Sequence, residues 1–235
     1  GVASVKELKK HVIARVDFTG AQEGGQRRNG RGQRVRASDT TAYSPDTAAR
    51  GRVGDDHGHG THVAGIIAAG GTKGNADTRG VAPGAQIVSL RVLDADGNGF
   101  AGDVVDAIDW AIENRNRYRI RVINLSLGGP VLQQCADDPV CQAVERAYRA
   151  GIVVVASAGN YGKDEAGNEV LGGITVPGNS PFAITVGAIN TKQTAQRSDD
   201  EVTTYSSRGV TRFDHLVKPD LAAPGNKIVG LLAPG

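Results

Sequence analysis

The stretch Gly58-His59-Gly60-Thr61-His62-Val63-Ala64-Gly65 decides how the rest of the sequence is interpreted. A histidine stands between two glycines and is followed by small and apolar residues, which predicts a loop that turns into a buried helix over residues 61–69. Glycine on each side of His59 lets another chain approach closely. The positive end of a helix dipole favours a neutral imidazole, the form that a general base needs. We therefore predict that His59 is a general base.

Around this stretch, apolar strands alternate with helices. Strands are predicted over residues 12–18, 86–92, 122–126, 152–156 and 183–188, and helices over 61–69, 103–114 and 142–150. This alternation predicts an α/β fold with a mainly parallel central sheet and helices on both faces, a three-layer sandwich. In such sheets the active site lies beyond the carboxyl ends of the strands. The Gly-rich and Arg-rich segment between the first strand and about residue 54 is predicted to be a solvated loop of uncertain order.

Composition limits the class of protein. The 235 residues are 39% hydrophobic and 22% charged, which is typical of a globular chain. No run approaches the roughly 20 apolar residues of a membrane span. The formal charge of +2 is too small to indicate a nucleic-acid partner. Neither an internal repeat nor a linker divides the sequence, so we expect a single domain over residues 1–235, whose oligomeric state the sequence does not indicate.

Three further segments combine small residues with exposed backbone groups. Val122–Gly129 ends a predicted strand in two glycines, and Val155–Asn160 ends another in Gly-Asn. An Asn amide can donate a hydrogen bond to a developing oxyanion without carrying a charge. Gly97-Asn98-Gly99 could let an extended peptide add as an extra strand, although a hairpin turn explains this pattern equally well on its own.

In this order, the four segments resemble the subtilisin-like serine proteases. The resemblance implies a serine endopeptidase that cleaves polypeptides through an acyl-enzyme, with His59 as base and Asn160 as oxyanion donor. It also implies that Gly97, Asn98 and Gly99 pair with the substrate backbone. The pocket for the side chain before the scissile bond is then walled by Ser126, Leu127, Gly128, Ala156, Ser157, Ala158 and Gly159. No cofactor is expected, and the structural calcium that is common in this family cannot be placed.

Two later segments resemble the approach to the family's nucleophile. They are Tyr205–Gly209 and Lys218–Gly225, and in the family a Gly-Thr-Ser-Met-Ala motif follows them. That motif does not occur in these 235 residues. We therefore expect a catalytic domain that is incomplete at both ends and inactive by itself.

The catalytic aspartate is a separate question, because a triad needs a carboxylate to orient the base. Asp17 is one candidate, but Phe18 separates it from the Thr-Gly that should follow directly, and Arg15 stands in the same strand. Gly1-Val2 could instead be the tail of an Asp-Ser/Thr-Gly-Val motif. We prefer the second interpretation, in which Asp17 is structural.

Cys135 and Cys141 are the only cysteines of the sequence. A local disulfide would suit a secreted protein and would stabilise it by roughly 2 kcal/mol in the chain-entropy picture. Two free thiols remain the alternative. With the resemblance, the cysteine pair leads us to expect a secreted protein, although no signal peptide is present in the sequence.

Other functions fit the sequence less well. His57, His59 and His62 have the outline of an HxHxxH metal motif, but the expected Asp before the last histidine is Thr61. An α/β-hydrolase would need Gly-x-Ser-x-Gly, which does not occur. A protease-like binding module without a nucleophile is the more serious alternative. His57 and His62 are taken as histidines without a catalytic role.

Overall fold

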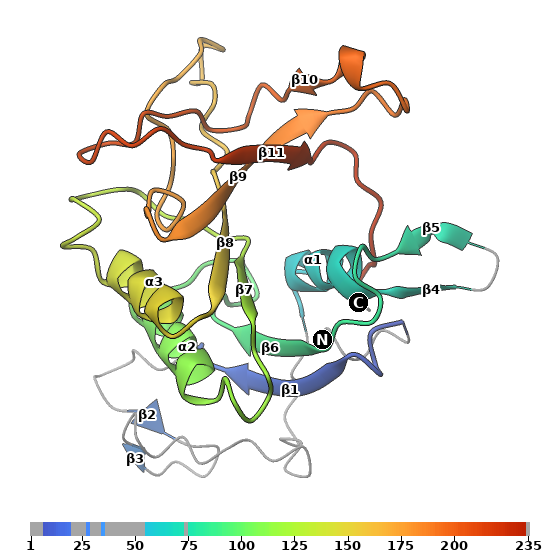
Figure 1. Ribbon diagram of the computed structural model, residues 1–235, viewed down its shortest axis with the longest axis vertical. Coiled ribbons are helices and arrows are strands. Elements are labelled where there is room, and N and C mark those ends of the chain that lie inside the picture. Colours follow the sequence, from blue (N-terminus) through green and yellow to red (C-terminus); the bar gives the residue numbers. More distant parts are fainter. Residues whose placement is uncertain (1–6, 20–26, 29–33, 36–54, 73–74, 234–235) are drawn as a thin grey trace. The chain divides into compact units, whose positions relative to one another are not determined.

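The computed structural model describes residues 7–19, 27–28, 34–35, 55–72 and 75–233. The chain forms two compact units, which are described separately (Figure 1). The first consists of residues 1–107 and 229–235, and the second of residues 108–228. The predicted loop after the first strand lies mostly outside the described residues, apart from the short antiparallel pair β2 (Arg27–Arg28) and β3 (Arg34–Val35).

In the first unit, strand β1 (Val12–Asp17) pairs in parallel with β6 (Ile87–Arg91), with Val16 opposite Leu90. Helix α1 (His59–Ala68) buries Thr61, Ala64, Gly65 and Ala68, which recur at helical spacing and form one face. The hairpin of β4 (Gly70–Thr72) and β5 (Asn75–Arg79) follows directly. These elements agree with the strands and the helix predicted from the sequence, whereas the hairpin was not predicted.

The second unit contains a five-stranded sheet. Strands β7 (Val122–Leu125), β8 (Val153–Ser157) and β9 (Ala183–Asn190) run parallel. Two short strands were not predicted: β10 (Glu201–Val202) is antiparallel to β9, and β11 (Leu221–Pro224) is parallel to it. The mainly parallel sheet is therefore as expected.

Two longer helices accompany these strands. Helix α2 (Ala101–Glu113) crosses the boundary between the units, and α3 (Pro139–Arg149) packs on β8 and β9. Val144, Ala147 and Val154 are almost completely buried where α3 meets the sheet. Arg146 of α3 makes a two-pronged ion pair with Asp109 of α2.

Both helices begin earlier than predicted. Helix α3 starts at Pro139 rather than at residue 142, because the Asp138 carboxylate accepts hydrogen bonds from the backbone N–H groups of Val140 and Cys141. Proline at the first helical position has no N–H that needs a partner. Helix α2 starts at Ala101 rather than at residue 103, because the Phe100 carbonyl already accepts bonds from Asp103 and Val104.

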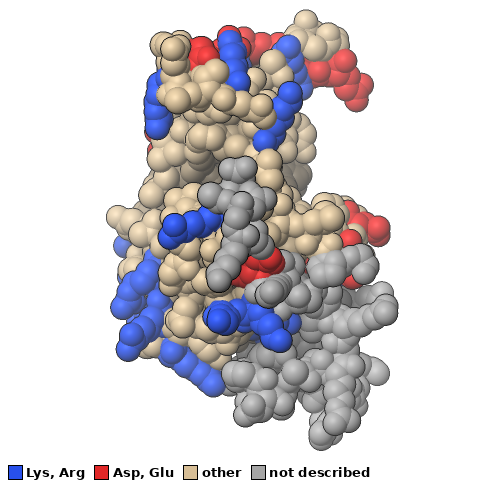
Figure 2. Space-filling view, turned by 90° about the vertical axis from the view of Figure 1, so that its right-hand side faces the viewer, with Lys and Arg blue, Asp and Glu red and all other residues tan. Residues whose placement is uncertain are grey.

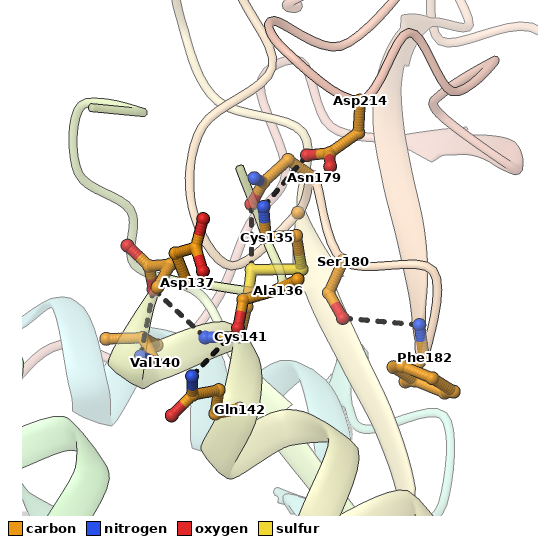
Figure 3. The surroundings of a disulfide bond; sticks show 12 residues. Cys135, Ala136, Asp137, Val140, Cys141, Gln142, Asn179, Ser180, Phe182 and Asp214 are labelled. Atoms are coloured by element: carbon orange, nitrogen blue, oxygen red, sulfur yellow. Dashed lines mark hydrogen bonds between the residues drawn. A yellow bond between two sulfur atoms is a disulfide. The ribbon is translucent and has the colours of Figure 1, made fainter. Parts of the chain in front are cut away.

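Cys135 and Cys141 are joined as a disulfide at the start of α3 (Figure 3). Their Cα atoms are 5.4 Å apart, within the usual range for a disulfide. The Cys135 N–H donates to Asp214 Oδ2 at 3.0 Å, which ties the closed loop to a segment 79 residues further along the chain. The pairing agrees with the predicted disulfide rather than with two free thiols.

We expect the same bond in the mature protein. Iodoacetamide should label neither cysteine unless the protein is first reduced, because both residues are buried and bonded to each other. A digest of unreduced protein, analysed by mass spectrometry, should contain the peptide with its sulfurs linked. Alkylation of both cysteines without reductant would disprove the pairing.

Charge is mixed over the surface. On the face drawn in Figure 2, Lys and Arg side chains and Asp and Glu side chains both occur among uncharged residues. Among the described residues, no helix is long and apolar enough to cross a membrane.

Candidate active site

His59 is the first residue of α1, as predicted, and Gly58 is its N-cap. The carboxylate of Asp55 holds this turn from outside the helix. It accepts hydrogen bonds from the Gly58 N–H at 2.9 Å and from the Thr61 N–H at 2.6 Å. Asp55 was not identified from the sequence. An acidic residue shortly before a helix start is the only signal that could have revealed it.

The surroundings of His59 lower the pKa of its imidazole below the ordinary 6.5. Partial burial is the main cause, and electrostatic interactions with His57 and His62 act in the same direction, whereas the Asp55 carboxylate opposes them. The pKa of Asp55 is itself lowered: burial raises it, but the hydrogen bonds from Thr61 and Gly58 outweigh that effect. The lowered pKa favours the neutral imidazole, which is the form that can accept a proton.

We expect an NMR titration of the 235-residue chain to give His59 a pKa below 6.5. Asp55→Asn should lower this pKa further, because the one charge that raises it is lost. His57→Gln should raise it, because an electrostatic interaction that lowers it is lost. Shifts in the same direction for the two variants would contradict this account of the site.

Asp17 ends β1, and its carboxylate is committed to local structure. Its Oδ1 accepts hydrogen bonds from the N–H of Thr19 at 2.9 Å and from the Thr19 hydroxyl at 2.7 Å. Its Oδ2 lies 3.9 Å from a guanidinium nitrogen of Arg91, on the neighbouring strand β6. These bonds close the turn after the strand, and the structural interpretation of Asp17 stays a prediction.

Gly97, Asn98 and Gly99 lie in a tight turn after β6. The Asp94 N–H donates to the Asn98 carbonyl at 2.8 Å, and Asp94 Oδ1 accepts from the Asn98 N–H at 2.9 Å. Gly97 has φ +81°, a conformation that other residues adopt only with strain. A Cβ atom on Gly99 would lie 2.3 Å from the Val92 carbonyl oxygen, so only glycine fits there.

In the second unit, the predicted pocket walls lie on neighbouring strands. Leu125 of β7 is opposite Ala156 of β8, which places the segments 126–128 and 156–159 next to each other. The Ser157 hydroxyl donates to the Leu127 carbonyl at 3.2 Å and links the two walls. The structure thus brings together the two segments that the sequence assigned to one pocket.

Thr175 connects these walls and was not found from the sequence. Its backbone N–H donates to the Ala158 carbonyl at 3.1 Å. A Cβ atom on Gly128 would lie 2.5 Å from the Thr175 hydroxyl oxygen, and one on Gly159 would lie 2.7 Å from its methyl carbon. Both wall glycines therefore make room for a single buried threonine.

Asn160 is exposed and follows Gly159, which has φ +104°. Buried Ser207 fixes the loop on both sides of Asn160. Its N–H donates to the Gly159 carbonyl at 2.9 Å, and its hydroxyl accepts from the Tyr161 N–H, also at 2.9 Å. The two hydrogen bonds from Ser207 fix the backbone on either side of Asn160. This structural role of Ser207 was not indicated by any sequence motif.

His59 and Gly97–Gly99 belong to the first unit, whereas Asn160 and the pocket walls belong to the second. The expectation that both groups act on one substrate therefore stays a prediction.

The acidic and histidine side chains of the described residues were compared with what a metal site requires. In the part of the chain that the structure describes, no three His, Cys, Asp or Glu side chains gather as a metal site requires. The side chains of His57, His59 and His62 therefore do not gather as the HxHxxH metal motif would require. The acidic run 199–201 is engaged elsewhere: Asp199 accepts from the Thr194 hydroxyl at 2.9 Å, and Glu201 pairs with Lys192 at 2.6 Å.

The mainly parallel sheet and the histidine at the start of α1 agree with the α/β fold that the sequence predicts. The model of the Subtilase family, Peptidase S8, matches residues 17–233. The chain belongs to this family.

Individual relatives agree with the family match. The chain is 36% identical over 250 residues to the serine protease AprX of Bacillus subtilis (strain 168), covering 97% of the chain and 55% of the relative. It is 35% identical over 181 residues to subtilisin E of the same organism, covering 77% of the chain and 40% of the relative. It thus spans about half the length of these curated relatives, or less.

Solved structures show the same fold. Sphericase superposes with a TM-score of 0.67 at 27% identity, covering 96% of this chain and 63% of that one. The S41 psychrophilic protease gives a TM-score of 0.64 at 29% identity, covering 93% and 61%. The subtilisin-like α/β fold predicted from the sequence is therefore confirmed.

Proposed function

We propose that the protein to which this chain belongs is a serine endopeptidase that hydrolyses peptide bonds in polypeptides. The observation that carries the proposal is His59, the first residue of α1, with its pKa lowered below 6.5. A neutral imidazole on a helix terminus can take a proton from a nucleophile at neutral pH. Membership of the subtilase family makes a serine hydroxyl the expected nucleophile.

In the proposed reaction, a serine oxygen attacks the carbonyl carbon of the scissile bond while His59 accepts the serine proton. The amide of Asn160 donates a hydrogen bond to the oxyanion of the tetrahedral intermediate. When the C–N bond breaks, His59 returns the proton to the leaving amine. Water then hydrolyses the acyl-enzyme, with His59 acting as base again, so that no cofactor takes part.

The serine itself belongs, by resemblance, to a Gly-Thr-Ser-Met-Ala motif that these 235 residues do not contain. We therefore propose that the 235-residue chain alone forms no acyl-enzyme. Ser207 is buried and holds the Asn160 loop, and Ser157 links the pocket walls, so neither is proposed as a substitute. Asp17 is proposed to be structural.

We also propose that the protein is secreted. The support is the disulfide between Cys135 and Cys141, because such bonds persist in oxidising compartments.

The function is tested with a fluorophosphonate probe, which labels activated serines. The chain extended at both ends by its natural flanking sequence should be labelled and should cleave casein. The 235-residue chain should show neither reaction. Labelling of the short chain would reveal an internal nucleophile, whereas an extended protein that folds without labelling would favour the binding-module alternative.

A further inference from the structure

A cavity of about 280 Å³ lies beside the disulfide, and the proposed reaction does not use it. Its volume is close to that of the smallest ligand pockets, so it has room for one long side chain rather than for a large cofactor. All of its walls belong to the second unit, and several of them can be followed in Figure 3. The walls include Cys135, Cys141, Phe182, Leu216, Glu145 and Asp214.

The walls combine apolar surface with negative charge. Phe182, Leu216 and the disulfide are apolar, whereas Glu145 of α3 and Asp214 each carry a carboxylate. Among the described residues, no Lys, Arg or His lines the cavity. Such a cavity fits a ligand that is apolar along its length and positively charged at its end.

The two carboxylates differ in what they already bind. Glu145 Oε1 accepts hydrogen bonds from the Arg149 guanidinium at 2.8 and 2.6 Å, and this guanidinium lies 5.8 Å from the centre of the Phe182 ring. Asp214 accepts only from the backbone, through the Cys135 N–H. Within the described residues, no Lys, Arg or His side chain pairs with Asp214. Its carboxylate is therefore available to a cation from outside.

We infer that this cavity binds an arginine side chain of a polypeptide partner, with the methylene stem against Phe182 and Leu216 and the guanidinium on Asp214. A guanidinium is more weakly hydrated than an ammonium, and its planar fork matches a carboxylate. Arg149 already combines a carboxylate and the Phe182 ring in this way next to the cavity. The inference goes beyond the proposed cleavage reaction, because none of these residues takes part in it.

Exposed aromatic side chains beside the cavity favour a polypeptide over a free guanidinium compound. The Tyr148 ring lies 5.4 Å from the Phe182 ring and is 56% exposed. Phe213 precedes Asp214 in the chain and is 48% exposed. These two rings offer apolar surface to the residues on either side of a bound arginine.

The test measures binding to the extended protein carrying His59→Ala, so that a bound peptide is not cleaved. The ligands are acetyl-Leu-Arg-Leu-amide and the same peptide with citrulline, which has the shape of arginine but no charge. NMR follows the backbone amides of Cys135, Ala136 and Leu216, because the first bonds directly to Asp214 and the others line the cavity. The arginine peptide should shift these signals to saturation. The citrulline peptide should bind about tenfold more weakly, the value of one hydrogen bond to a charged group.

Asp214→Asn keeps an oxygen for the Cys135 N–H but loses the charge, so it should weaken the arginine peptide about tenfold and remove its advantage over citrulline. Asp137→Asn is the matched control. Asp137 is exposed, lies in the same segment as Cys135 and does not line the cavity, so this variant should bind both peptides as before. n-Butylguanidinium, which lacks the flanking residues, should shift the same signals but bind several-fold more weakly than the arginine peptide.

Equal binding of the two peptides, or cavity signals that the arginine peptide does not shift, would overturn the inference even if Asp214→Asn fails to fold. An unchanged affinity in a folded Asp214→Asn protein would also overturn it. If n-butylguanidinium binds as tightly as the peptide, the polypeptide partner is wrong. Binding is measured without cleavage, so a failure here leaves the endopeptidase proposal to its own test.

Discussion

Replacing His59 by Ala in the extended protein should abolish fluorophosphonate labelling and casein cleavage. A serine hydroxyl is a weak nucleophile at neutral pH, and its attack depends on a base that takes its proton. Removing the catalytic histidine alone from a subtilisin lowers kcat by a factor of about 2 × 10⁶. We adopt this magnitude for the extended protein. The expected loss is therefore several orders of magnitude, beyond any effect of a small change in folding.

His62→Gln is the matched control, because it changes a histidine one turn further along α1 and keeps a hydrogen-bonding side chain. That variant should keep its activity within a few-fold. Circular dichroism should show both variants folded, since His59 is the first residue of α1 and is not among the residues that the helix buries. If the His59→Ala protein stays fully active, another residue is the base and the assignment of the site is wrong.

The fold could be predicted because its signals extend over many residues. Strands such as Val122–Leu125 and Val153–Ser157 are short apolar segments between turns, and α1 repeats small residues at helical spacing. Strand β10 escaped prediction because it has only two residues, and β11 (Leu-Ala-Ala-Pro) because small residues and a proline replace the large apolar residues that mark the other strands. Their formation depends on β9, which offers them a partner edge.

Helix starts were less predictable for a different reason. The hydrophobic pattern marks where a helix becomes buried, whereas the cap marks where it begins. Asp138 caps α3 four residues before the predicted start of the helix at residue 142, and Asp55 holds the start of α1 from three residues before its N-cap. These capping hydrogen bonds depend on where the folded chain places the carboxylate. A single acidic residue in a loop does not reveal that position in the sequence.

The candidate site shows the same division. His59, Asn160 and the glycine-containing segments were found because they belong to strings whose order resembles a family. Thr175 and Ser207 were missed, although one packs between Gly128 and Gly159 and the other holds the backbone around Asn160. Their roles arise from residues that are far apart in sequence. Sequence patterns thus identified the groups proposed to act on substrate, but not the buried residues that position them.

Asn160→Ala should lower kcat of the extended protein by about 10²–10³, the loss measured when a subtilisin loses one oxyanion donor. KM should change little, because the amide hydrogen bond strengthens only as negative charge develops on the carbonyl oxygen. Stability should also change little, since Asn160 is exposed and its loop is held by Ser207 through the neighbouring residues. The expected pattern is therefore a fall in kcat without a fall in melting temperature.

Asn168→Ala supplies the control for this prediction, because Asn168 is another exposed asparagine of the same unit, bonded to Asp164 in a surface turn. It should leave kcat unchanged. Asn160→Asp should be as damaging as Asn160→Ala, because a carboxylate keeps the shape of the side chain but replaces the donor by a negative charge that repels the oxyanion. Steady-state kinetics on one peptide substrate distinguishes the three variants. If Asn160→Ala raises KM and leaves kcat intact, Asn160 contributes to substrate binding rather than to the transition state, and the oxyanion donor has to be sought among other groups.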